Sequence, residues 1–122
     1  IYQVLKNLVT NAIKYSDPRT SVTVYITKRK KVATIHVEDQ GKGIAKNHRK
    51  RVFERFYRIE KSRSKERGGT GLGLAISKHI IEGHKTKIKL KSKVNFGSTF
   101  FFNLKLLPKK IKKRQKIAQT LN

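Results

Sequence analysis

Hydrophobic residues in the first fifteen positions recur at steps of three and four, which is the spacing of one face of an amphipathic helix. These apolar positions are Ile1, Val4, Leu5, Leu8, Val9, Ala12 and Ile13. The segment Ser16-Asp17-Pro18 then ends the pattern, because a residue before proline avoids the helical conformation. The sequence therefore predicts a helix over residues 1–15.

Two β-hairpins are predicted by runs that alternate between apolar and polar residues. The first joins residues 21–28 to 32–37, with Asp39 just past its end, and the second joins 86–92 to 99–106. Between the hairpins we expect a short helix over 46–56, a charged loop over 58–69, and a helix from Gly71 that Gly83 closes. The order α, β, β, α, α, β, β predicts an α+β fold with a mixed sheet and helices on one face.

Composition limits the class of protein. The chain has 122 residues, enough for one domain, which we place at residues 1–107, followed by a basic tail at 108–122. Its 31 Lys and Arg against 7 Asp and Glu give a net charge of +24, which favours polyanionic ligands. The absence of cysteine excludes disulfides and thiolate metal sites, and no apolar run is long enough to span a membrane. Because the chain starts inside a predicted helix, we expect a piece of a longer protein.

Two groups of residues are candidates for binding chemistry. Asn7, Asn11 and Lys14 share one helix face, and their amide oxygens and cation suit a triphosphate with a divalent ion. Taken alone, the same residues are more typical of an ordinary solvent-facing helix surface. Asp39 lies at a strand end, and Gly41 follows two residues later, where a glycine lets a ligand approach the backbone closely. The carboxylate of Asp39 could therefore accept a hydrogen bond from an exocyclic amine such as that of adenine. An ordinary turn would have the same residues.

A third candidate is the glycine-rich stretch at residues 68–73, which leads into a predicted helix. Free backbone N–H groups and the helix dipole favour an anion at such a place. A Walker loop would need Lys and Ser or Thr after its last glycine, where this chain has Leu74 and Ala75. A dinucleotide fingerprint would need a preceding strand and a third glycine where Ile76 stands. Both of these motifs are excluded.

Taken in order, these segments resemble the boxes of the GHKL ATP-binding superfamily in its sensor histidine kinase form. Residues 3–16 resemble its N box, 39–44 its first glycine box, 52–58 its F box, 69–76 its second glycine box and 97–104 its closing strand. The match runs from residue 1 to about 107. It implies a two-layer α/β sandwich of the GHKL (Bergerat) type, whose sheet is mixed but mostly antiparallel, and whose first strand is missing here.

The resemblance also implies ATP and Mg²⁺ as ligands, and roles for single residues. Asn11 would bind Mg²⁺ with Asn7 beside it, Lys14 would contact the phosphates, and Arg58 would reach the γ-phosphate. Tyr15 would cover the nucleotide and Asp39 would read the adenine amine. The remaining nucleotide-binding residues would be Gly41 and Gly43 beside the base, Phe53 and Phe56 holding the lid, Gly69, Thr70, Gly71, Leu72 and Gly73 at the phosphates, and Thr99 supporting the adenine pocket.

One position indicates which branch of the superfamily the chain resembles. Gyrase B subunits and mismatch-repair ATPases carry a glutamate four residues before the magnesium asparagine, where it acts as a general base on water. Here that position is Asn7, and an amide cannot accept a proton at neutral pH. The resemblance therefore implies transfer to a histidine imidazole instead of hydrolysis.

The resemblance implies partners as well: a dimerisation and histidine-phosphotransfer domain of the parent kinase, and a response regulator downstream. This part of the protein would be cytoplasmic in a bacterium, or stromal in a plastid, whether or not the parent is membrane-anchored. Two alternatives stay open. The charge is compatible with a nucleic-acid-binding module, although no base-reading motif is present and binding would be non-specific. A serine kinase of the anti-sigma-factor type belongs to the same superfamily.

Overall fold

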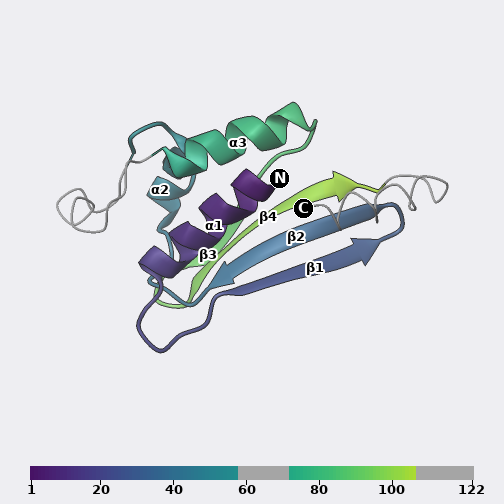
Figure 1. Ribbon diagram of the computed structural model, residues 1–122. Coiled ribbons are helices and arrows are strands. Elements are labelled where there is room, and N and C mark those ends of the chain that lie inside the picture. The colour runs from purple at the N-terminus through teal and green to yellow at the C-terminus, as the bar shows by residue number, and fades with distance from the viewer. Residues whose placement is uncertain (58–71, 107–122) are drawn as a thin grey trace.

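In the described part of the chain, a four-stranded antiparallel sheet carries helices on one face (Figure 1). The computed structural model describes residues 1–57 and 72–106. Its elements are α1 (Tyr2–Tyr15), β1 (Thr23–Arg29), β2 (Val32–Asp39), α2 (Lys46–Arg49), the 3₁₀ turn η1 (Arg51–Phe53), α3 (Gly73–Gly83), β3 (Lys89–Lys93) and β4 (Gly97–Lys105). The order across the sheet is β1-β2-β4-β3, so the two hairpins meet where β2 pairs with β4.

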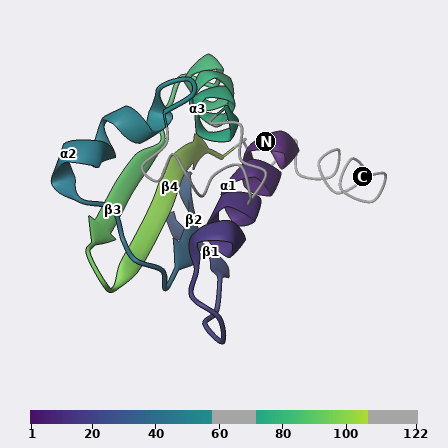
Figure 2. The same cartoon turned by 90° about the vertical axis from the view of Figure 1, so that its left-hand side faces the viewer.

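The core lies between the sheet and the helices α1 and α3, which occupy the same side of it (Figure 2). Along β4 every second residue from Ser98 to Phe102 is buried, as expected for a strand with one face against a core. The buried apolar cluster consists of Val4, Leu8 and Ala12 from α1, Ile35 and Val37 from β2, Ile81 from α3, and Phe100 and Phe102 from β4. These α1 residues are the stripe that the three- and four-residue spacing predicted.

The α+β class, the order of elements, the first helix and both hairpins are confirmed. Some details were wrong. All pairings among the described strands are antiparallel, so the sheet is not mixed there. Asp39 is the last residue of β2 instead of following it. In the second hairpin the first strand begins later than predicted, at Lys89, and the second strand begins earlier, at Gly97. The third helix begins at Gly73, not at Gly71.

The short helix expected over 46–56 is also shorter than predicted. It ends at Arg49, and a single 3₁₀ turn follows before Glu54 takes an extended conformation. Phe56 then has a φ of 64°, which a right-handed helix does not allow. The loop expected over 58–69 and the tail at 108–122 lie outside the described residues. Within the described part of the chain, no helix has the length and apolar character needed to cross a membrane.

Candidate functional site

Asp39 is the buried carboxylate of the site. Its side chain is 7% exposed and points to the helix-covered face at the end of β2. One carboxylate oxygen, Oδ1, accepts a hydrogen bond from the backbone N–H of Gly41 at 2.9 Å. Burial raises the pKa of Asp39 above its ordinary value; the backbone N–H groups of Gly41 and Ser98 oppose this rise, and the charge of Glu38 adds to it. A hydrogen-bond acceptor is thus held in a dry environment.

Glycines allow the backbone to pass unusually close to this carboxylate. A Cβ at Gly41 would collide with the carbonyl oxygen of Tyr15, at the end of α1, and one at Gly97 would collide with the carbonyl oxygen of Asp39. Gly43 has a φ of 73°, and a Cβ there would collide with the carbonyl oxygen of Lys93. The segment 39–43 is therefore wedged between the end of α1 and the β3–β4 turn.

Side chains from α2 and β3 fix the same segment. The Ser92 hydroxyl accepts a hydrogen bond from the Ile44 N–H at 2.6 Å and lies 2.7 Å from the Ser98 hydroxyl. The guanidinium of Arg49 donates to the carbonyl oxygen of Ile44 at 3.0 Å and to that of Ser92 at 2.5 Å. Because these bonds join three elements, the loop after Asp39 is held on both sides.

Asn7 joins the first helix to the start of α3. Its amide Nδ2 donates to the Ser77 hydroxyl at 3.3 Å and to the Gly73 carbonyl oxygen at 3.5 Å. The face of α1 that carries Asn7, Asn11 and Lys14 therefore looks towards the first turn of α3. Asn11 is half-buried one turn further along, about 6 Å from Asn7 along the helix axis. Tyr15 ends α1 beside Gly41, so the half of α1 from Asn7 to Tyr15 lies between the first turn of α3 and the Asp39 loop.

The glycine-rich segment is described only at its end. Leu72 precedes α3, and Gly73 is its first residue. A Cβ on Gly73 would meet no atom within 4 Å, so the neighbouring described residues do not demand a glycine there. Arg58, Gly69, Thr70 and Gly71 lie outside the described residues, and their predicted roles stay predictions.

Two of the predicted residues lie elsewhere than expected. Thr99 pairs with Glu38 on the face of the sheet that the helices do not cover, so it cannot support a pocket next to Asp39. Ser98, paired directly with Asp39 and 6% exposed, occupies that place. Phe53 packs edge-on against Phe100, with ring centroids 5.8 Å apart, which is equally typical of an ordinary core residue, so its predicted role at the lid stays a prediction. Phe56 is 69% exposed and does not share that packing.

Sequence reasoning missed several residues of the site. Ser77, Ser98 and Gly97 contact its predicted members, and Ser92 and Arg49 hold Ile44, which follows Gly43. Gly97 and Ser98 lie in the segment 97–104 that resembles the closing strand, which was the available signal. Ser77, Ser92 and Arg49 belong to no spacing pattern, because their partners lie far away in the sequence.

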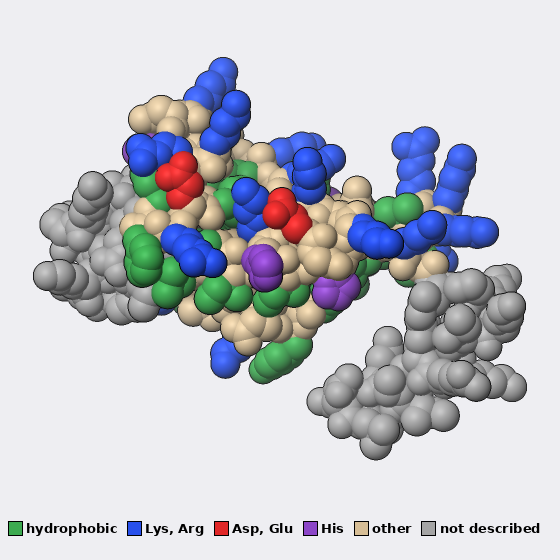
Figure 3. Space-filling view, turned by 90° about the horizontal axis from the view of Figure 1, so that it is seen from above, with side chains coloured by type: hydrophobic (Ala, Val, Ile, Leu, Met, Phe, Trp, Pro, Cys, Tyr) green, Lys and Arg blue, Asp and Glu red, His purple; other side chains and the backbone are tan. Residues whose placement is uncertain are grey.

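Positive charge predominates on the helical side of the molecule. Lys and Arg side chains are spread over the helical face, where acidic side chains are sparse (Figure 3). Among the described residues, no cluster of three or more His, Cys, Asp or Glu could hold a metal ion. The arrangement suits an anionic ligand that carries its own metal-binding oxygens.

Comparison with known proteins agrees with this geometry. The family model described as "Histidine kinase-, DNA gyrase B-, and HSP90-like ATPase" matches residues 1–108. The chain is 48% identical over 104 residues to the sensor-like histidine kinase SenX3 of Mycolicibacterium smegmatis, covering 85% of the chain and 27% of that protein. It is 39% identical to the sensor histidine kinase RppB of Synechocystis, over 85% of the chain and 23% of that protein. The chain thus spans about a quarter of the length of these curated relatives.

Solved structures of the same kind are similar. The mycobacterial sensor histidine kinase MprB matches with a TM-score of 0.74 and 30% identity, over 87% of this chain and 70% of that one. The catalytic domain of the histidine kinase ThkA matches with a TM-score of 0.70 and 30% identity, over 84% and 64%. Neither the nucleic-acid-binding module nor the anti-sigma-type serine kinase is favoured by these matches. The chain belongs to the histidine kinase-, DNA gyrase B- and HSP90-like ATPase family, in which it is a catalytic ATP-binding domain of the sensor histidine kinase type.

Proposed function

We propose that this domain binds Mg-ATP and transfers the γ-phosphate to a histidine on the dimerisation domain of its parent two-component sensor kinase. The observation that carries the proposal is the buried carboxylate of Asp39, held by Gly41 at the end of β2. A desolvated acceptor discriminates strongly between a ligand that donates a hydrogen bond and one that does not, because an unmet partner costs about 1–3 kcal/mol. Adenine carries an exocyclic amine that can donate this hydrogen bond, whereas guanine has a carbonyl oxygen at the same position of its ring.

The residues of α1 fit the triphosphate end. Asn11 would supply an amide oxygen to Mg²⁺, which favours oxygen ligands and accepts phosphate oxygens for the rest of its shell. When bound, the ion neutralises charge on the triphosphate. Lys14 would contact the phosphates from the same helix face. Arg58 and the glycines Gly69, Gly71 and Gly73 complete the phosphate contacts in this proposal, with Thr70 and Leu72 between them.

The chemistry that this chain can supply is positioning and charge stabilisation. Asn7 donates its amide to Ser77 and Gly73, so it is engaged in holding α3 and cannot act as a base on water. A neutral imidazole needs no such base, because it is already a nucleophile. These facts support transfer to histidine over hydrolysis.

The partners follow from the same proposal. The acceptor histidine would lie on a dimerisation and histidine-phosphotransfer domain, and a response regulator would take the phosphate from it. SenX3 and RppB are named as sensor kinases, which supports this assignment for a domain of the same type. We place the domain in the cytoplasm, where ATP is available, or in the stroma if its source is a plastid.

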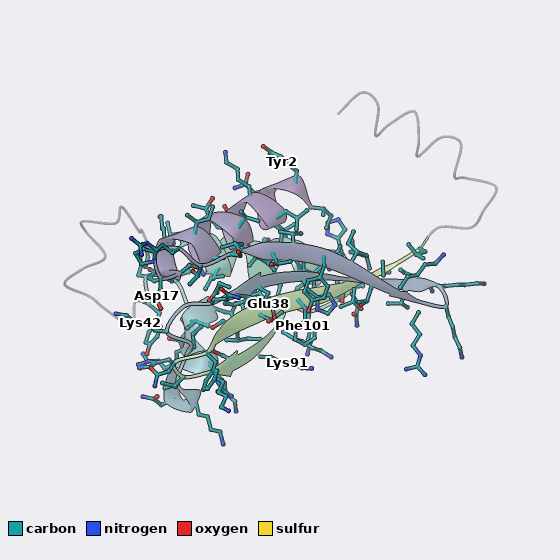
Figure 4. The ribbon with its side chains drawn as sticks, turned by 90° about the horizontal axis from the view of Figure 1, so that it is seen from below. Tyr2, Asp17, Glu38, Lys42, Lys91 and Phe101 are labelled. Carbon is teal, nitrogen blue, oxygen red and sulfur yellow. The ribbon has the colours of Figure 1, made fainter. Side chains whose placement is uncertain are left out.

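The test is nucleotide affinity in Asp39→Asn, with Asp17→Asn as the matched control. Asp17 is an exposed carboxylate in the loop after α1, so its loss changes the net charge equally without touching β2 (Figure 4). We expect Asp39→Asn to weaken Mg-ATP binding about 5- to 150-fold and to reduce the preference over GTP. The Asp17→Asn protein should bind as the wild type does. Equal affinities in all three proteins would contradict the role of Asp39.

A further inference from the structure

The face of the sheet opposite the helices carries a row of aromatic side chains. Tyr25, His36 and Phe101 pair directly across β1, β2 and β4. The rings of Tyr25 and His36 stack with centroids 4.3 Å apart and planes inclined by 6°, and those of His36 and Phe101 with centroids 5.8 Å apart and planes inclined by 19°. No described helix covers this row, and Figure 4 shows Phe101 on it, with Glu38 and Lys91 nearby.

A row of cations lies beside the aromatic row. Lys89, Lys91 and Lys93 alternate along β3, are exposed, and share the face of Phe101. The ammonium of Lys91 lies 5.6 Å from the centre of the Phe101 ring. Arg29 and Lys105 add two more cations on the same face at the far end of β1 and β4, against one carboxylate, that of Glu38. We call this surface, defined by Tyr25, His36, Phe101 and the three β3 lysines, the outer sheet face.

One ring of the stack, that of Tyr25, could stack with a further planar group. The Phe101 end is next to the ammonium of Lys91, whereas Tyr25 lies on β1, an edge strand with no described strand beyond it. The side chain of Tyr25 is 38% exposed. A planar group could extend the stack on Tyr25. Polar groups continue beside it, where Thr27 bonds to His36 and Thr34 bonds to Asn103.

We propose that the outer sheet face binds single-stranded nucleic acid. The strand would cross the sheet, with phosphates on the β3 lysines at one edge and an unstacked base on Tyr25 at the other edge, three strand spacings or about 14 Å away. Aromatic platforms beside a basic track are what sequence-tolerant binding of single strands needs. A duplex keeps its internal bases stacked on one another and offers none of them to Tyr25, and a purely acidic chain such as polyglutamate has no ring for it. This function goes beyond ATP binding and is separate from it, because Asp39 lies on the other face of the sheet.

The test compares matched variants of the whole chain in binding a fluorescent oligo(dT). Tyr25→Ala is paired with Tyr2→Ala, since Tyr2 is 79% exposed on α1 and lies away from the outer sheet face. Lys89→Gln/Lys91→Gln is paired with Lys6→Gln/Lys78→Gln, which removes the same charge from the exposed sides of α1 and α3. Thermal unfolding and Mg-nucleotide affinity confirm that each variant is folded.

We expect Tyr25→Ala to lose about tenfold in oligo(dT) affinity, and Tyr2→Ala to lose almost none. The β3 double variant should lower the slope of log affinity against log salt by about 1.4, and the helical pair should lower it less. Equal losses in both members of each pair would mean diffuse attraction to the +24 charge and would overturn the proposal. So would polyglutamate or duplex binding that depends on Tyr25 as strongly as oligo(dT) does.

Discussion

The side chain of Asp39 is buried, and burial raises the pKa of its carboxyl group. Ionisation of this group at neutral pH therefore lowers the free energy of unfolding. At pH values between the ordinary pKa of 3.8 and the raised pKa of the folded state, the folded protein binds more protons than the unfolded chain. Stability therefore falls as the pH rises through this window, and the loss persists above it. A residue kept in such a position is best explained by what it binds.

The nucleotide-free Asp39→Asn protein should accordingly be more stable than the wild type at pH 7. The amide oxygen of the new side chain can still accept the hydrogen bond from Gly41, while the desolvated charge is gone. Thermal midpoints measured between pH 3 and pH 8 check this, and the difference should shrink as the pH falls towards 3.8. A variant that is less stable at pH 7 would show that the hydrogen bonds to the carboxylate outweigh its desolvation.

At the scale of the elements, the features that could be predicted are those whose sequence pattern lies within a single segment. Helix α1 and both hairpins follow from periodicity within about ten residues, and the structure has them at nearly the predicted bounds. The pairing of β2 with β4, and the contact of Asn7 with α3, join distant segments that no local pattern relates. The error at Thr99 is a shift of one residue, which in a strand reverses the face.

Asn7 provides a test of how α1 and α3 are joined. Replacing it with alanine leaves the fully buried Ser77 hydroxyl without its amide donor, which should cost about 1–3 kcal/mol of unfolding free energy. Gln3→Ala removes an exposed amide one turn earlier, which bonds to Asn7 at 3.3 Å, and should cost below about 0.5 kcal/mol. Urea unfolding of both variants measures this.

A double-mutant cycle with Ser77→Ala then isolates the contact itself. A coupling energy of about 0.5–3 kcal/mol between Asn7 and Ser77 is expected, because the two side chains touch. If the two substitutions were additive, the hydrogen bond would not contribute to joining α1 with α3.

At the scale of the whole molecule, repulsion between like charges dominates the electrostatics. The net charge is +24, and the ion pair between Arg51 and Glu54, at 3.4 Å, is exposed on both sides and so contributes little. Added salt screens repulsion over the Debye length, about 10 Å at 0.1 M. The thermal midpoint should rise between about 20 and 300 mM NaCl, by roughly 4 °C for each kcal/mol of repulsion removed. A midpoint that falls with NaCl would show that attractive pairs outweigh the repulsion.

The whole chain should bind ATP without labelling itself. None of its four histidines is placed as an acceptor: His36 stacks on the face opposite Asp39, His48 bonds to Tyr57, His84 bonds to the carbonyl oxygen of Ile80, and His79 lies exposed on α3. Asn7 cannot activate water, so phosphate release should be slow as well.

Addition of a separate dimeric helical hairpin with an acceptor histidine should give acid-labile phosphate on that hairpin when γ-labelled ATP is present. Catalysis by positioning allows this, because the nucleophile need not belong to the chain that holds the nucleotide. Labelling should fall in Asp39→Asn by the same factor as nucleotide affinity at low ATP, and should be unchanged in Asp17→Asn. Acid-stable phosphate on this chain alone would indicate a serine kinase, and rapid phosphate release without the hairpin would indicate an ATPase; either result would contradict transfer to histidine.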